Sequence, residues 1–596
     1  MNFECFDFGT DFSDCVTPPS LGFLEAPSTL AVKPLANAFE ALNQTMEECL
    51  HSRCKPVFHI FSGDCGTGKS TNVHRFISAW KKAGFPGDGS VIIFLGSFKE
   101  VDSYRTGCEL DAADYACMSP DPVYAAIGRG KARAGEAKVL FVTHQQAWRK
   151  LLDTGSFEAI TDFHYQGRPR SLRLWDELIN PAYPVSFRLD LLHGLPAAMR
   201  TFAPELAEAV DRLHVRAADR REGYRLTFPK ALRKLANACA MACKDWLKGH
   251  KDYASLLEGL IHLAGREAVL RKDNRYGWIV VGIGQPLPDD FAPLIILDGS
   301  ARLRPSYRTW ADRSSNVRYL PPAEAVYSEA KIYWWDKGAS KATLSKPVDR
   351  SVIVGACVDL INAKPDERWL VIYHKDAFEN GVGGSPSVIE DMKAQRLSHP
   401  ANVTFLPWGQ HLASNEHADI KNVIIIGGLH YSEHSYEAVY MASMGQLMSM
   451  EAVDLRPTRD GEFAHHIYQA ACRSNLRRVN EDGVAGQADI YLIAANRDKR
   501  QPIIEQAFPG CTIETWQPVD RKKTKEDMFL DVVPGLFAGR RDVPLKEVGQ
   551  ACGGEGAEYL KALWKRPAII RCMKEHDIEK HKRTLRRIYR PRALVA

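Results

Sequence analysis

The chain has 596 residues, of which 45% are hydrophobic and 25% are charged, and its formal net charge is +5. This length suits about four domains of typical size, and the composition is that of a globular protein with several buried cores. The longest apolar runs, such as "VIIFLG" and "NVIIIGG", fall well short of the roughly 18 residues of a membrane-spanning helix. They therefore predict buried strands, and the composition argues against a membrane partner.

The N-terminal segment 1–30 is rich in Pro, Gly and acidic residues, which predicts a loosely packed arm without the pattern of a secretory signal. The 14 cysteines include no CxxC pair, which favours reduced thiols in a cytoplasmic protein over a zinc ribbon or an iron–sulfur cluster. Cys239 and Cys243 lie one helical turn apart, but two ligands do not complete a metal site, so core packing is the plainer interpretation. After the arm, apolar residues recur at helical spacing from Leu35 to Leu50 and predict a helix that packs on a sheet.

A glycine-rich segment, "GDCGTGKS", follows the apolar run "VFHIF" and precedes the amphipathic segment "STNVHRFISAWKK". It fits the pattern GxxxxGK[ST] in the strand–loop–helix context that a phosphate-binding loop (P-loop) requires. We expect backbone N–H groups and the helix N-terminus to hold the phosphates of ATP, Lys69 to neutralise the β- and γ-phosphates, and Ser70 to ligate magnesium. The residues expected to contact the nucleotide are Gly63, Gly66, Thr67, Gly68, Lys69, Ser70 and Thr71.

Three further strand-like runs follow, beginning at Val91, Lys138 and Leu172, and only the last ends in adjacent acidic residues, Asp176 and Glu177. A P-loop needs a carboxylate at the end of a neighbouring strand to complete its metal site. We therefore expect Asp176 to hold magnesium and Glu177 to act as the general base toward the attacking water.

The order of motifs resembles that of the superfamily 2 helicases, the DEAD/DEAH-box-like nucleic-acid motors. "GDCGTGKST" resembles motif I, "WDEL" motif II, "LIILDGSARL" motif III, "RWLVIYHKD" motif IV and "LPWGQHLASNEHADIKNVIIIGG" motif V. "FLGSF" and "FVTHQQAW" occupy the places of strand-end segments that touch nucleic acid in that family. The resemblance implies that Ser300 of motif III links the ATP site to the bound strand.

The segment "QAACRSNLRR", residues 469–478, resembles motif VI. In a motor of two RecA-like domains this motif supplies cations from the facing domain to the γ-phosphate, so hydrolysis requires a closed cleft. Arg473 and Arg477 are four residues apart and Gln469 is one turn earlier, which predicts that all three lie on one helical face. An exposed basic helix is the alternative interpretation.

The motifs depart from the family in three places. Motif II reads Asp-Glu-Leu-Ile, so the residues usual at its third and fourth positions are absent. Leu476 occupies the usual position of the second motif VI arginine, so Arg477 or Arg478 must serve. No adenine-reading Q-motif precedes the P-loop, although Gln44 is at a loosely suitable distance. The unusual spellings would fit a plasmid or phage origin.

These features predict an α/β chain with two tandem RecA-like P-loop domains. We expect the first domain at 31–325, with a helical insertion at about 190–272 that either covers the nucleic-acid path or only elaborates the helical layer. In the first domain, "RYGWIVVGIG" and "LIILDGS" should return to the sheet. The second domain is expected at 326–520, where strands alternate with helices, and a small basic helical region at 521–596.

Two segments carry surplus positive charge: residues 561–592 hold 12 Lys or Arg against 3 Asp or Glu, and residues 211–234 hold 8 against 3. Such segments suit a polyanionic partner, although solvated helix faces show the same pattern. "LKEVGQACGGEGAEYLKALW" predicts a helix–turn–helix with its turn at Gly553–Gly554, or a small helical bundle.

The sequence as a whole predicts an ATP- and magnesium-dependent helicase or translocase, with nucleic acid as its partner and DNA favoured over RNA. A nucleotide-dependent switch or assembly protein that does not unwind a strand remains the alternative. A packaging motor of the terminase kind would require a nuclease domain with clustered acids, and the C-terminal segment has none.

Overall fold

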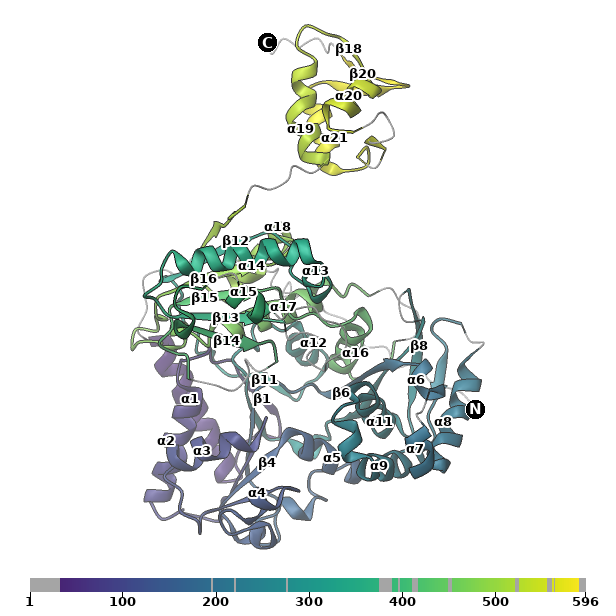
Figure 1. Cartoon of the computed structure of the whole chain (residues 1–596). Helices are drawn as coiled ribbons and strands as arrows, with labels where there is room; N and C mark the ends of the chain where they lie inside the picture. Colours follow the sequence, from purple (N-terminus) through teal and green to yellow (C-terminus); the bar gives the residue numbers. More distant parts are fainter. Residues whose placement is uncertain are drawn as a thin grey trace, which may run out of the picture. The chain divides into compact units, whose positions relative to one another are not determined.

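The computed structural model describes residues 33–194, 197–218, 221–274, 277–374, 388–394, 397–409, 416–448, 453–519, 525–554, 560–561 and 563–588. The arm expected at 1–30 lies outside these residues. The contacts within the chain divide it into two units, Met1–Trp516 and Gln517–Ala596. The first unit contains two parallel sheets and one antiparallel sheet (Figure 1).

The seven-stranded sheet of the first unit has the order β11-β1-β10-β5-β2-β4-β3, and every recorded pairing in it is parallel. Its strands are β1 (Phe58–Phe61), β2 (Val91–Leu95), β3 (Tyr115–Met118), β4 (Val139–Thr143), β5 (Leu172–Asp176), β10 (Leu294–Leu297) and β11 (Val317–Tyr319). The helices around it are α1 (Lys33–Leu50), α2 (Lys69–Lys82), α3 (Val101–Gly107), α4 (Pro122–Ala126), α5 (His144–Thr154) and α12 (Pro305–Arg313). We call this sheet with its helices the first lobe.

Both faces of this sheet are covered, as its near-continuous apolar strands require. The first-lobe helices α1, α2 and α3 share one core with alternate strand residues, for example Leu42 and Ile77 with Ile93. On the other face, α5 and α12 pack through Trp148 and Tyr307. The helix expected from Leu35 to Leu50 is thus present and packs on the sheet.

The six-stranded sheet has the order β14-β13-β15-β16-β12-β17 and is also parallel. Its strands are β12 (Ala330–Trp335), β13 (Trp369–Tyr373), β14 (Val403–Pro407), β15 (Asn422–Ile426), β16 (Ala488–Ile493) and β17 (Thr512–Thr515). Its helices are α13 (Lys341–Leu344), α14 (Pro347–Asn362), α15 (Val388–Ala394), α16 (Glu433–Met444), α17 (Arg456–Ala471) and α18 (Arg497–Ala507). We call this group the second lobe; α14 and α15 cover one face of its sheet, and α17 and α18 cover the other. The prediction of an α/β fold with two parallel sheets is confirmed.

The insertion in the first lobe is larger than expected and is not purely helical. A four-stranded antiparallel sheet, β6-β9-β8-β7, begins at Ala182 and ends at Pro286. Its strands are β6 (Ala182–Arg188), β7 (Arg225–Thr227), β8 (Glu267–Asp273) and β9 (Gly277–Pro286), and its helices are α6 (Asp190–His193), α7 (Ala197–Phe202), α8 (Pro204–Ala218), α9 (Leu232–Ala242), α10 (Lys244–Leu247) and α11 (Lys251–Leu263). The run "RYGWIVVGIG" therefore contributes to this sheet as β9, and not to the main sheet as predicted.

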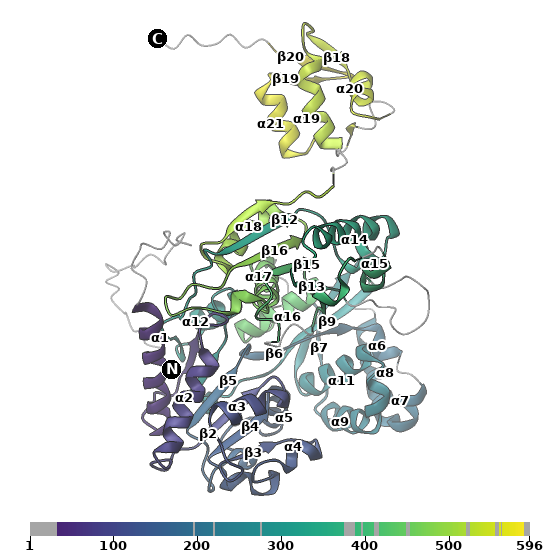
Figure 2. The same cartoon turned by 60° about the vertical axis from the view of Figure 1, so that its left-hand side comes forward.

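The insertion sheet is covered on both faces, which explains its apolar strands. The insertion helices pack on one face, through residues such as Leu213, Leu232 and Leu260. Helix α16 of the second lobe packs on the other, where Met441 and Ala442 meet the insertion strands. Figure 2 shows the insertion helices α6 to α11 gathered beside the main body of the first unit. The insertion therefore contacts both lobes.

The second unit, Gln517–Ala596, is not a simple helical region. It contains α19 (Lys525–Leu536), β18 (Asp542–Pro544), α20 (Leu545–Ala551), α21 (Pro567–Glu575), β19 (Ile578–His581) and β20 (Thr584–Arg587), and its strands form an antiparallel sheet β18-β20-β19 (Figure 2). The expected small basic helical region therefore has helices in its described residues, but the sheet was not predicted. Three-residue and four-residue strands of mixed polarity carry too little alternation to be recognised from the sequence.

None of the helices in the described ranges is both long enough and apolar enough to cross a membrane.

Candidate functional site

The P-loop lies between β1 and α2, and β1 is next to the edge strand β11 of the first sheet. Its backbone needs glycine, since Gly66 has a φ of 87° and Gly68 a φ of 101°, values that favour residues without a Cβ atom. The Lys69 Nζ atom donates a hydrogen bond to the Gly63 carbonyl at 2.6 Å. Because α2 begins at Lys69, its first N–H groups have no partner within the helix and face the loop. This is the geometry of an anion cradle.

The adjacent acids lie at the end of β5: Asp176 is its last residue and Glu177 follows it. In the sheet, only β10 separates β5 from β1. Asp176 is buried, and the Tyr104 hydroxyl donates to its Oδ2 atom at 2.8 Å. Glu177 has a φ of 73°, in the left-handed region that non-glycine residues rarely occupy. Backbone strain of this kind concentrates at functional sites.

A third acid, Asp298, lies close enough to this pair for its charge to act on Glu177. It was not among the residues predicted from the sequence. It follows β10, is fully buried, and accepts hydrogen bonds from the Ser300 backbone N–H and from the Tyr307 hydroxyl. Burial, together with the negative charges of Asp298 and Asp176, raises the pKa of Glu177 to about 8. Burial also raises the pKa of Asp176. Its position directly after a central strand was the signal that could have identified Asp298.

The second lobe meets the P-loop through the C-terminal end of α17 and the turn after it. The Tyr468 hydroxyl accepts a hydrogen bond from the Cys65 backbone N–H at 2.7 Å. The Cys65 Sγ atom lies 3.9 Å from Gln469 Oε1. A Cβ atom built on Gly66 would lie 2.0 Å from the Arg477 carbonyl oxygen, so the backbone of the second lobe is in direct contact with the loop.

Arg473 and Arg477 do not share a helical face, contrary to the prediction. Helix α17 ends at Ala471, and Arg473 lies in the turn that follows. Ser474 then begins a new turn: it is extended, its side chain accepts a hydrogen bond from the Leu476 N–H, and Asn475–Arg477 form a 3-10 turn. Arg473 is 3% exposed and donates to Gln469 Oε1 at 3.3 Å, whereas Arg478 is exposed.

Three cations nevertheless converge on the loop. The pKa of the Cys65 thiol is lowered to about 6, first by a hydrogen bond with Cys472, against the effect of burial, and then by the positive charges of Lys69, Arg477 and Arg473. Burial and the neighbouring Arg477 lower the pKa of Arg473, while the charges of Cys65 and Glu177 oppose that shift. The Gln469 side-chain nitrogen is buried and has no hydrogen-bond partner among the described residues. The site thus combines three cations with three carboxylates.

Motif III residues connect the lobes at two further points. Arg302 pairs with the fully buried Asp64 of the P-loop at 2.9 Å and donates to the Ala507 carbonyl of α18 at 2.9 Å. Ser300 donates to Asp298 at 2.6 Å and lies 2.7 Å from His465 Nδ1 on α17. Apart from Ser300 and Asp298, these partners are between 165 and 238 residues apart, and no local pattern in the sequence marked their pairing.

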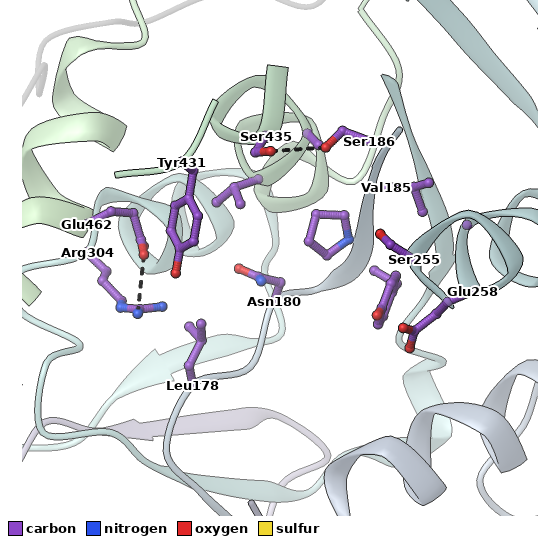
Figure 3. A pocket seen from close by; sticks show the side chains of 15 residues that line it. Leu178, Asn180, Val185, Ser186, Ser255, Glu258, Arg304, Tyr431, Ser435 and Glu462 are labelled. Atoms are coloured by element: carbon purple, nitrogen blue, oxygen red, sulfur yellow. Dashed lines mark hydrogen bonds and ion pairs between the residues drawn. The ribbon is translucent and has the colours of Figure 1, made fainter. Parts of the chain in front are cut away.

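A cavity of about 330 Å³ lies beyond the acids, between the first lobe, the insertion and the second lobe. Figure 3 shows Leu178 and Asn180 on one side, with Tyr431 and Ser435 of the second lobe opposite. Arg304 and Glu462 form a buried ion pair at 3.4 Å at one end of this cavity. Ser186 of β6 and Ser435 of α16 are hydrogen-bonded at 3.1 Å across it.

The donor set fits magnesium with a nucleotide. Asp176 has one oxygen held by Tyr104, so the other can serve as a ligand, and Ser70 stands at the start of α2. The buried Asp176 and Asp298 and the half-buried Glu177 form a group of carboxylates that a divalent cation would neutralise. Within the described ranges no group of three or more His, Cys, Asp or Glu side chains could hold a metal. Proteins usually bind Mg²⁺ through one or two carboxylates, with waters and phosphate oxygens completing its shell.

Other candidate residues have simpler explanations. Cys239 and Cys243 are buried in the apolar core of the insertion, and burial raises the pKa of Cys239 to about 12. Gln44 donates to Glu48 on the exposed side of α1. In the basic run 211–234, Arg212 and Arg225 pair with Glu208 and Glu267, so part of its charge is neutralised locally.

No protein-family model matches the chain, and no curated protein matches it. Solved structures do match the chain. Xpd4 of S. tokodaii matches at 12% identity with a TM-score of 0.44, over 80% of this chain and 99% of that one. Dbp5 of S. cerevisiae, bound to RNA and ADP BeF3, matches at 10% identity with a TM-score of 0.34, over 81% of this chain and 94% of that one.

The helicase Lhr of Mycobacterium smegmatis, bound to ssDNA and AMP-PNP, matches at 14% identity with a TM-score of 0.29, over 93% of this chain and 58% of that one. These likenesses concern the fold alone. The plasmid or phage origin stays a prediction.

Proposed function

We propose that the protein is an ATP-dependent nucleic-acid helicase or translocase that hydrolyses ATP in the cleft between its two lobes. One observation supports this most strongly: the second lobe brings Arg473 and Arg477 next to the P-loop lysine and the acids of the first lobe. A protein that only binds nucleotide needs the first lobe alone. Cations contributed by a separate lobe are needed where hydrolysis is coupled to closure of a cleft.

In the proposed mechanism Lys69 and the N–H groups at the start of α2 bind the β- and γ-phosphates. Ser70 and Asp176 would hold magnesium, which supplies positive charge to the phosphate oxygens. Glu177 orients and deprotonates the attacking water. A cation beside Asp176 would lower the raised pKa of Glu177 toward the range that a base at neutral pH requires. Arg473 and Arg477 stabilise the charge that develops on the γ-phosphate, and Gln469 positions Arg473.

The contacts between the lobes suggest how nucleotide would affect a bound strand. Ser300 and Arg302 each join an acid of the ATP site to a helix of the second lobe. A change of charge at the P-loop therefore acts directly on the relative position of the lobes. Nucleic acid bound across both lobes, with DNA favoured over RNA, would be moved by each cycle of closure and opening.

The test is ATP hydrolysis measured with a panel of single- and double-stranded DNA and RNA. We expect low turnover alone and strong stimulation by at least one nucleic acid. Lys69→Ala should abolish turnover, and Glu177→Gln should abolish it while fluorescent nucleotide still binds. If saturating nucleic acid leaves the rate unchanged while both variants behave as expected, the protein is a nucleotide-dependent switch and not a motor.

A further inference from the structure

The second unit carries a basic surface of its own. The three helices and small sheet in its described residues enclose one apolar core, which includes Phe529, Val548, Ile569 and Leu585. Among the described elements, α21 comes after α20 and is followed by the hairpin β19–β20, an order typical of the winged helix–turn–helix type. Helix α20 ends just before Gly553, whose φ is 82°, whereas residues 555–559 of the predicted second helix lie outside the described ranges.

Helix α21 exposes a mixed basic and apolar face. Ile569 and Cys572 are buried against the core, while Ile570, Arg571 and Lys574 are exposed on the side away from it. Ile570 is 54% exposed and is the most exposed large hydrophobic side chain in the described part of this unit. A helix that carries an apolar side chain between cations can contact both a thymine methyl group and the phosphates that border a groove.

The hairpin extends this basic surface. Lys582 and Arg583 form its turn, and both are exposed. Its strands have four residues each, so each strand spans about 13 Å. That reach is similar to the width of the B-DNA major groove, about 12 Å. A helix in the groove would therefore leave the hairpin next to the flanking phosphates.

Two arginines of this region form ion pairs inside the unit: Arg566 pairs with Glu526, and Arg586 pairs with Asp542. Among the described residues, no ion pair is recorded for five exposed cations of the surface: Lys565, Arg571, Lys574, Lys582 and Arg583. The exposed acids Glu575 and Glu579 offset this charge only in part.

We propose that α21 and the β19–β20 hairpin bind duplex DNA, with α21 in the major groove and the hairpin on the adjacent backbone. Duplex RNA fits this surface poorly because the A-form major groove is too narrow for a helix. Single strands are usually held by exposed aromatic rings. In the described part of the unit, Phe529 and Phe537 are buried, and Trp564 is half-buried between Phe529 and Lys580.

The experiment uses the full chain carrying Lys69→Ala, without nucleotide, so that the result does not depend on hydrolysis. Fluorescence anisotropy measures binding to a 20-base-pair DNA duplex, the RNA duplex of the same sequence and the single DNA strand, from about 50 to 200 mM salt. Arg571→Glu and Lys582→Glu test two different elements of the surface. Arg541→Glu is the matched control, because Arg541 is also exposed and has no recorded ion pair among the described residues. Its carbonyl accepts a hydrogen bond from the Arg587 N–H group, at the end of β20 away from the turn.

We expect each test variant to weaken binding to the DNA duplex roughly tenfold. Each should also reduce the slope of log affinity against log salt by about 0.9, the loss of one phosphate contact. Arg541→Glu should change neither quantity more than twofold, and melting temperatures should match. The proposal is overturned if both test variants bind like Arg541→Glu, or if only binding to RNA or to the single strand falls. None of these outcomes depends on whether the ATP cleft drives a motor.

Discussion

The lobes of the first unit meet at the P-loop and at the insertion, and the two contacts differ in their share of apolar side chains. Around the P-loop the lobes meet through charged and hydrogen-bonding groups, among them Arg302 with the Ala507 carbonyl and Ser300 with His465. At the insertion an apolar patch, in which Met441 of α16 packs on the antiparallel sheet, lies beside the Arg271–Glu437 ion pair and the Ser186–Ser435 hydrogen bond. Apolar contact is insensitive to the charge of a ligand, whereas the polar contact changes with every charge that enters or leaves the cleft.

This difference indicates a division of labour. We expect the apolar contact to persist through the catalytic cycle and to act as the pivot. The polar contact should break and re-form as nucleotide binds and is hydrolysed. The two contacts can be separated experimentally, because substitutions in the polar contact should affect catalysis most, and substitutions in the apolar contact should affect stability most.

The largest effect is expected for Arg473→Ala. Removing a cation that stabilises a phosphoryl-transfer transition state lowers the rate by roughly 10³-fold or more. The measurement is steady-state ATP hydrolysis at saturating nucleic acid, with nucleotide binding followed separately by fluorescence. Arg478→Ala is the control, since Arg478 is the exposed arginine of the same segment and should leave the rate within twofold. A rate for Arg473→Ala equal to that of the unaltered protein would remove the basis for a two-lobe ATP site.

The buried ion pair between Arg304 and Glu462 comes next. Arg304→Met leaves Glu462 buried without its partner, which costs roughly 3–5 kcal/mol. Burial raises the pKa of Glu462 and Arg304 opposes that shift, so in the variant the folded chain retains a proton on Glu462 that the unfolded chain has lost. Stability then falls as pH rises through the folded pKa. We therefore expect a greater loss of melting temperature at pH 8 than at pH 5.

Arg308→Met provides the comparison for this experiment, because Arg308 is exposed on α12, the helix that begins directly after Arg304. It should melt like the unaltered protein at both pH values. Equal melting temperatures for Arg304→Met and Arg308→Met would show that the pair at the end of the cavity does not join the lobes.

The apolar contact is tested by Met441→Ala. Truncating this fully buried side chain leaves a cavity against the insertion sheet and should cost about 3 kcal/mol. Thermal unfolding measures that loss, while ATP hydrolysis at a temperature below the transition should stay within about tenfold of the unaltered rate. Val348→Ala, at a 78% exposed position on α14, should change neither. If Met441→Ala reduced hydrolysis as strongly as Arg473→Ala, the two contacts would not be separable.

The same contrast explains what the sequence could reveal. The P-loop, the strands that carry the acids and the alternation of the second lobe are local patterns, and the structure contains each of those elements. The insertion sheet was missed because β6 and β9 pair across about 90 intervening residues that are mostly helical, and antiparallel pairing of that kind leaves no local signal. The helix predicted to continue through Arg477 ends early. The Ser474 side chain accepts a hydrogen bond from the Leu476 N–H group, which in a continuing helix would bond to a backbone carbonyl one turn earlier.

The smallest effect is expected for Ser300→Ala, which tests whether the polar contact transmits information. The substitution removes the hydroxyl that bonds both Asp298 and His465, yet it removes no group that would touch the nucleotide. Leaving these buried partners without the hydroxyl costs about 1–2 kcal/mol, so stimulation of hydrolysis by nucleic acid should fall about tenfold while the basal rate changes less than twofold. His465→Asn offers a second way to break the link from the other lobe, and it should give the same pattern. A fall in the basal rate equal to the fall in the stimulated rate would mean that Ser300 only holds Asp298 in place, and that the lobes communicate through Arg302 instead.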